Sequence, residues 1–227
     1  MVTTRALRCA IAVATGLSAA GAASAADPVS FNLASIPTAQ VAHYYVGQAR
    51  GLYKAAGMDV TIRRGPGSGE AVRTVASGAS TSFSLNYFYQ RRNVEQAGKK
   101  LKVIPYADYG FEIYSLCVIA SESTTQKNPD LVKRFLAATK QALEWTVENP
   151  KGAAEIYHKE FPLSNVEDDK DEIAAMGKFV FNDYGKRTGF GFEDERLKKT
   201  YEIVAKARDL DVNASPRVAI DTSLAPK

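Results

Sequence analysis

The chain contains few of the residues that build reactive or metal-bound sites. Its 227 residues include two cysteines, two histidines and one tryptophan. No group of cysteines and histidines has the spacing of a metal site, and no serine, cysteine or histidine stands in the sequence context of a hydrolase nucleophile. We therefore expect no metal ion, no cofactor and no catalytic residue, and a protein that is not an enzyme.

A large excess of charge of one sign is also absent. The 29 lysines and arginines nearly balance the 25 aspartates and glutamates, so the formal net charge is +4. A nucleic-acid-binding surface needs a clustered and much larger positive charge. The sequence therefore predicts no nucleic-acid partner.

Long hydrophobic runs are absent too, apart from a short one near the N-terminus. There Arg5 and Arg8 precede an apolar stretch over residues 9–17, and the small residues Ala23-Ser24-Ala25 follow. This order is typical of a cleavable secretory signal peptide, and the stretch is shorter than the ~20 apolar residues that span a bilayer. We expect residues 1–25 to be removed and the mature protein to lie in the periplasm.

The first half of the mature chain alternates between strand and helix patterns. Apolar residues recur at every second position in the expected strands and at helical spacing in the expected helices. Strands joined by helices of these lengths imply right-handed crossovers and a mainly parallel sheet, so we expect an α/β fold. The expected elements are strands at 29–33, 58–62 and 81–85, helices at 41–50, 52–56 and 70–77, and a glycine-rich turn at 65–69.

The second half is mainly helical in pattern. Pro129 opens a long helix that ends at Glu148, because proline is favoured at the first helical position. Its apolar stripe predicts a buried face formed by Leu131, Val132, Phe135, Leu136, Ala142, Leu143 and Val147. Other expected elements are a strand at 101–105, helices near 151–158, 167–181 and 193–209, and an irregular tail at 216–227.

For two shorter segments of this half, the sequence predicts whether the side chains are buried or exposed. The apolar run 111–121 fits a central strand, in which Cys117 would be buried. Because Cys9 would leave with the signal peptide, we expect no disulfide within the chain. The acidic residues 167–169 and 171–172 are expected at an exposed helix start, where carboxylates complement the helix dipole.

Three features could contact a small molecule. The turn GPGSGE at residues 65–70 leads into a helix and offers backbone N–H groups to an anion; the alternative is a plain strand-to-helix connection. His43 and Tyr44 lie in the first helix near the carboxyl edge of the sheet, where open α/β sheets bind ligands. For His43 a surface or capping role is the simpler alternative. The aromatic residues 87–89 could stack on a planar ligand or belong to the core.

Two stretches of the sequence resemble a known family. They are HYYVGQARGLYKAAGMDVTIRRGPGSGEAVRTVASG and AGKKLKVIPYADYGFEIYSLCVIAS, the second followed by NPDLVKRFLAATKQALEWTVENP. Both are similar to the periplasmic substrate-binding proteins of ABC transporters, in the group that serves nitrate, sulfonates, taurine and thiamine-pyrimidine precursors. The resemblance implies a periplasmic-binding-protein-like (type II) fold that binds a small organic solute non-covalently and presents it to a permease at the inner membrane.

The resemblance also implies a set of ligand contacts. By position they fall on the turn after the first strand, the start of the first helix, the glycine-rich turn and the aromatic segment. The implied ligand-binding residues are Ile36, Thr38, His43, Tyr44, Gly67, Ser68, Gly69, Tyr87 and Tyr89.

The chain departs from the family pattern in three ways. The tryptophan common after the first strand is replaced by Ala34-Ser35-Ile36-Pro37, and the acidic residue expected near residues 89–91 is missing, which weakens a pyrimidine assignment. Most of the second lobe also lacks a counterpart. We therefore expect residues 26–227 to form one lobe, with an N-terminal half at 26–85, a remnant crossover at 86–110, and a return strand and C-terminal helices at 111–227. The open inter-lobe face would favour self-association.

Two other functions remain as alternatives. Some proteins of this fold are enzymes that make the thiamine pyrimidine with a lysine-bound aldehyde cofactor, but the export signal and the lack of a lysine beside His43 argue against that activity. The other alternative is a truncated paralogue that binds no solute and acts as an interaction module.

Overall fold

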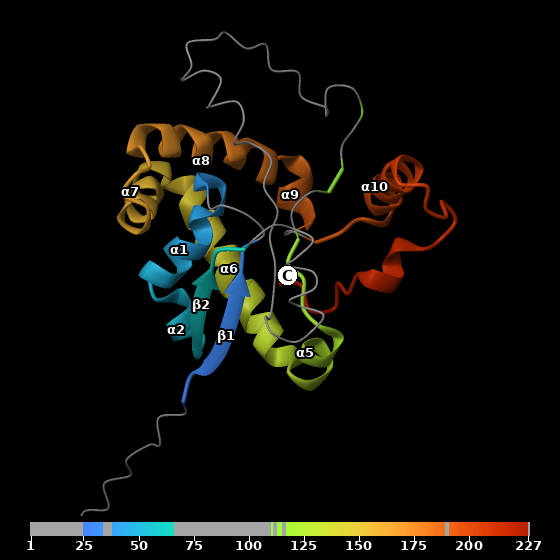
Figure 1. Cartoon of the computed structure of the whole chain (residues 1–227), viewed down its shortest axis with the longest axis horizontal. Coiled ribbons are helices and arrows are strands. Elements are labelled where there is room, and N and C mark those ends of the chain that lie inside the picture. Colours follow the sequence, from blue (N-terminus) through green and yellow to red (C-terminus); the bar gives the residue numbers. More distant parts are fainter. Residues whose placement is uncertain are drawn as a thin grey trace, which may run out of the picture.

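The computed structural model describes residues 25–33, 38–65, 110, 113–114, 117–188 and 191–226 (Figure 1). These residues form an α/β arrangement, in which a small parallel sheet is covered by helices and the C-terminal part is helical. Within these ranges no helix combines the length and the apolar character that crossing a membrane would require. The predicted elements between residues 66 and 109 lie outside the described part.

Two strands form the sheet. β1 (Asp27–Asn32) pairs in parallel with β2 (Met58–Arg63), and Val29 lies opposite Val60. Buried and more exposed residues alternate along β2, as expected for a strand with one face on the core. The parallel pairing and both strand positions predicted from the sequence are confirmed.

The connection between the strands is helical. It consists of η1 (Ala39–Val41), α1 (Ala42–Ala49) and α2 (Leu52–Ala55). Gly51 and Gly57 adopt φ angles of 69° and 74°, a region that glycine enters without steric cost, and they end the two helices where the sequence predicted.

The long helix α6 (Pro129–Glu148) packs against α1 and α2 and confirms the predicted helix. Pro129 occupies its first turn, and Phe135 stacks on Tyr53 of α2 with ring centroids 5.5 Å apart. The buried stripe is rotated from the predicted one and consists mostly of small residues. Its members are Phe135, Ala138, Thr139, Ala142 and Thr146, whereas Leu136, Leu143 and Val147 are only partly buried.

Of the remaining helices, α5 precedes α6 along the chain and the others follow it. α7 (Pro150–Glu160), α8 (Val166–Val180) and α10 (Asp194–Ala207) confirm the three predicted helices. α5 (Glu122–Lys127), α9 (Asp183–Thr188) and the short η3 (Pro216–Ala219) were not predicted. α8 and α9 lie beyond the carboxyl ends of β1 and β2 (Figure 1), and α8 packs against η1.

Three predictions for the second half are wrong. Residues 117–120 form no strand, and Cys117 is exposed rather than buried. Nearby, the backbone N–H of Tyr114 donates to the side-chain hydroxyl of Thr200 on α10. In a β-sheet this N–H would instead donate to a carbonyl of a neighbouring strand. Asp169 is 1% exposed rather than part of an exposed helix start, because its face of α8 packs inward.

Candidate functional site

The carboxyl edge of the sheet carries a group of buried polar residues. β1 and β2 end at Asn32 and Arg63, and η1 and α1 begin shortly after β1. Thr38, Gln40 and His43 lie there with exposed fractions of 7%, 3% and 6%. Parallel sheets bind ligands at this edge, so we name these three residues the edge group.

The geometry of His43 defines its protonation state. Its Nδ1 lies 3.1 Å from the carbonyl oxygen of Gln40, and a carbonyl can only accept a hydrogen bond. Nδ1 therefore carries the hydrogen, and Nε2 is left as an acceptor. Burial lowers the pKa of His43 to about 4, only partly offset by the Gln40 hydrogen bond, so the ring is neutral near pH 7.

Aromatic packing fixes the position of the His43 ring. The centroids of the His43 and Tyr44 rings lie 4.0 Å apart, and those of the Tyr44 and Phe31 rings lie 4.3 Å apart. Within the described part of the chain, no residue forms a hydrogen bond with His43 Nε2. A fixed neutral imidazole with a free acceptor nitrogen can receive a hydrogen bond from a ligand.

Gln40 contributes a donor with no partner. Its side-chain nitrogen Nε2 is buried and lacks a hydrogen-bond partner among the described residues. A buried polar group in this state costs about 1–3 kcal/mol. Native proteins rarely keep such a group without a reason, and an acceptor atom of a bound ligand is one such reason.

Helix α8 covers the same edge. It packs against η1, and the buried Asp169 lies in its first turn. Asp169 and Thr38 both have interaction partners in the structure, unlike the amide nitrogen of Gln40. The edge group is therefore enclosed by a helix from the C-terminal part of the chain.

The structure brings together three of the implied ligand-binding residues. Thr38, His43 and Tyr44 lie within one stretch of η1 and α1, and all are buried, so His43 has no surface role. The other implied residues, Ile36, Gly67, Ser68, Gly69, Tyr87 and Tyr89, lie outside the described residues. Gln40 and Asp169 were missed. Gln40 could have been noticed as a polar residue among the apolar residues at the start of the first helix. The sequence does not distinguish Asp169 from the acidic residues next to it.

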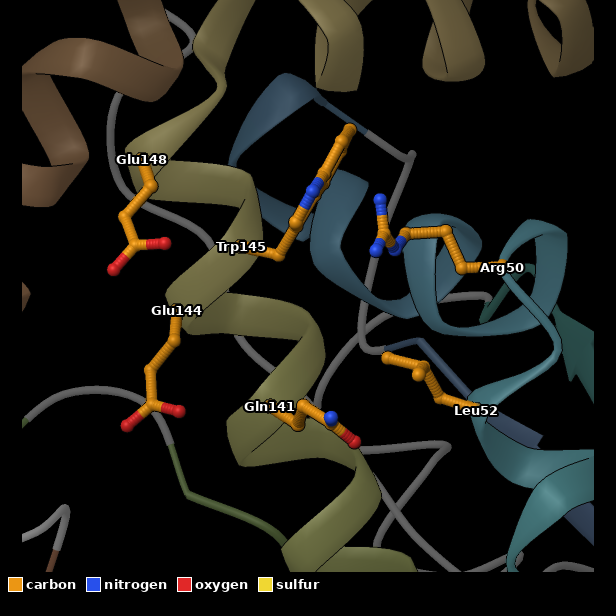
Figure 2. A pocket seen from close by; sticks show the side chains of 6 residues that line it. All are labelled: Arg50, Leu52, Gln141, Glu144, Trp145 and Glu148. Atoms are coloured by element: carbon orange, nitrogen blue, oxygen red, sulfur yellow. The ribbon is translucent and has the colours of Figure 1, made fainter.

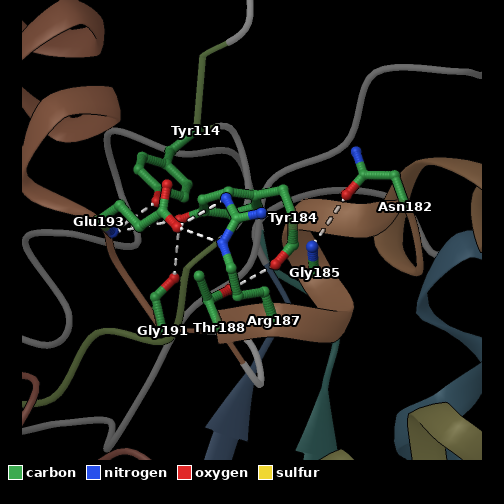
Figure 3. Close-up of polar contacts among 8 residues, drawn as sticks. All are labelled: Tyr114, Asn182, Tyr184, Gly185, Arg187, Thr188, Gly191 and Glu193. Carbon is green, nitrogen blue, oxygen red and sulfur yellow. Dashed lines mark hydrogen bonds and ion pairs between the residues drawn. The ribbon is translucent and has the colours of Figure 1, made fainter.

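A second polar cluster connects α9 with the start of α10 (Figure 3). The guanidinium of Arg187 donates to the carboxylate of Glu193 over 3.0 and 2.8 Å. The backbone N–H of Glu193 donates to the hydroxyls of Tyr114 and Tyr184, at 2.9 and 3.2 Å. The Tyr184 hydroxyl donates to the carbonyl of Gly191 at 3.2 Å. These bonds fix two tyrosine rings beside each other.

A small open cavity of about 210 Å³ lies between α1, α2 and α6 (Figure 2). The guanidinium of Arg50 stacks over the ring of Trp145 at 4.2 Å from its centroid. The cavity is smaller than the ~300 Å³ at which ligand sites for drug-sized molecules begin, and it contains none of the implied ligand-binding residues. Its lining residues are Arg50, Leu52, Gln141, Glu144, Trp145 and Glu148.

Metal binding finds no support in the described ranges. No group of three or more histidine, cysteine, aspartate or glutamate side chains is placed there to hold a metal ion. The edge group itself offers hydrogen bonding, from the neutral Nε2 acceptor of His43 and the amide donor of Gln40.

Comparison with known proteins gives a family. No curated protein sequence matches the chain. Among solved structures, a conserved Candida albicans gene product, described as exhibiting the generic periplasmic binding protein structural fold, is similar with a TM-score of 0.46 and 14% identity, over 78% of this chain and 94% of that one. The NMT1/THI5-like family matches residues 38–90 and 81–153. Because these segments together make up half of the chain and include the edge group, the protein belongs to the NMT1/THI5-like family.

Proposed function

We propose that this protein is the exported solute-binding component of an ABC-type importer. It would bind a small organic solute non-covalently in the periplasm and present it to a permease at the inner membrane. The family supports a solute-binding role in general, and the signal-peptide pattern of residues 1–25 supports export.

One observation carries the proposal. The Gln40 amide nitrogen is buried without a partner among the described residues, three positions before a neutral histidine whose Nε2 accepts no hydrogen bond from them. A donor and an acceptor of this kind match the edge of a polar heterocycle or an amide. Buried polar groups that pair only with a ligand also make binding specific, because an analogue without the matching groups leaves them unpaired.

A substitution at Gln40 tests the proposal. Because its amide nitrogen has no partner, Gln40→Leu should leave the free energy of unfolding unchanged or raise it by about 1 kcal/mol. The same variant should lose the ligand-induced thermal shift that the wild type shows with a panel of pyrimidines, sulfonates and aromatic acids.

Gln48 provides the matched control on the same helical segment. Its side-chain nitrogen donates to the carbonyl of Val60 at 3.1 Å, and the residue is exposed. Gln48→Leu should therefore lower stability by about 1 kcal/mol and leave the ligand response intact. A wild-type protein that shows no shift with any compound would contradict the proposed function. A Gln40→Leu variant that responds like the wild type would remove Gln40 from the site.

A further inference from the structure

Arg196 in the first turn of α10 differs from the arginines around it. Arg187 forms an ion pair with Glu193, and Arg217 forms one with Asp194. Arg196 forms no ion pair in the described part of the chain, and its Nε is buried without a hydrogen-bond partner. Asp194 and Glu193, two and three residues before Arg196, are thus already paired with other arginines. Glu195 is exposed and does not pair with it either.

Two aromatic rings hold the Arg196 guanidinium instead of a carboxylate. Its central carbon lies 4.3 Å from the ring centroid of Tyr184 and 5.2 Å from that of Tyr114. Stacking on a ring leaves the N–H groups at the rim of the guanidinium available for hydrogen bonds in its plane. The guanidinium is therefore held in position, and no carboxylate among the described residues neutralises it.

The rings that position Arg196 are themselves fixed. Both tyrosine hydroxyls accept the backbone N–H of Glu193 (Figure 3). The backbone N–H of Tyr114 also donates to the hydroxyl of Thr200, one turn after Arg196. The ring of Phe192 packs on Tyr114 with centroids 4.8 Å apart. The arrangement is preorganised, so a ligand would not have to order these side chains.

We propose that Arg196 is the anion-binding residue of this protein and takes an oxoanion: a carboxylate, a sulfonate or a phosphate. Such groups accept two parallel hydrogen bonds from the guanidinium fork, which would supply the missing partner of Nε. The oxoanion is either a free inorganic ion or the acidic group of the transported solute. The second source rests on the proposed function, whereas the first does not.

The test observes the Arg196 Nε–H directly. In a proton–nitrogen correlation spectrum of the mature protein, sodium sulfate, sodium phosphate, methanesulfonate, taurine and benzoate are titrated against sodium chloride at constant ionic strength. We expect a saturable shift of the Arg196 Nε–H signal with at least one of these anions. The absence of any saturable shift in the wild type would overturn the proposal.

Variants separate anion binding from a purely structural role. Arg196→Lys keeps the charge but lacks the fork and should bind about tenfold more weakly, as followed by the backbone amide of Glu193. Arg217→Gln removes an equal charge from the same region and should bind like the wild type. Equal binding by Arg196→Lys and the wild type would assign Arg196 to structure only.

The choice of anion distinguishes the two sources. Methanesulfonate, taurine or benzoate binding about tenfold more tightly than sulfate and phosphate would identify the acidic group of an organic solute. Equal or tighter binding of the inorganic ions would identify a free anion. Anion binding at Arg196 in a protein that shows no thermal shift with organic solutes would sustain this inference while contradicting the proposed function.

Discussion

At the scale of single residues, His43 couples stability to pH. Burial lowers the pKa of its imidazole from 6.5 to about 4 in the folded protein, so between these values the unfolded state binds a proton that the folded state does not. The free energy of unfolding should therefore fall by about 1.4 kcal/mol per pH unit as the pH falls through this range. Above pH 6.5 the contribution of His43 is fully present.

His43→Asn isolates this contribution. The asparagine amide can still donate to the Gln40 carbonyl but does not titrate. Between about pH 7.5 and about pH 4.5, the wild type should lose about 2–3 kcal/mol more than the variant in urea unfolding. The fluorescence of Trp145, the single tryptophan, follows the transition. Equal losses in both proteins would show that His43 is not buried as described.

Single residues of the site could be predicted only in part. The placement of Thr38, His43 and Tyr44 followed from a strand that turns directly into a helix, which is local information. The burial of Gln40 and Asp169 could not be predicted, because it depends on α8 packing against η1 from a distant part of the chain. Long-range packing therefore decides which polar residues become part of the site.

At the scale of elements, the packing of α6 is tested at Ala142. This residue is fully buried on α6, which packs against α1, while the neighbouring Gln141 is exposed. Ala142→Leu should lower the free energy of unfolding by about 1–3 kcal/mol, since a close-packed interface has no room for the added carbons.

Gln141→Leu is the control for that substitution. It adds a leucine one position away, at an exposed residue on the rim of the open cavity, so the free energy of unfolding should change by less than about 0.5 kcal/mol. Urea unfolding of both variants measures the difference. An equal effect at the two positions would contradict the packing of α6 against α1.

The elements themselves were largely predictable. Periodicity located β1, β2, α1, α2 and α6, and the glycines after α1 and α2 fixed their ends. The expected strand around Cys117 was wrong because an apolar run does not reveal whether a neighbouring strand supplies hydrogen bonds. At Tyr114 the partner is a threonine hydroxyl on α10.

At the scale of the whole molecule, the family match joins both halves of the chain. It includes the crossover from η1 to β2 and continues through α6 to Ala153. The predicted loss of most of the second lobe stays a prediction, as does self-association through an open inter-lobe face. Both bear on how firmly a solute is held, because a single lobe encloses a ligand from one side only.

Native mass spectrometry of the mature protein, isolated from the compartment to which it is exported, tests the central claim most directly. We predict a chain with one small organic molecule bound, which is released on denaturation and is absent from Gln40→Leu. A covalent adduct would instead indicate an enzyme. A stable oligomer that carries no small molecule would indicate an interaction module. Either result would contradict non-covalent solute binding at the edge group.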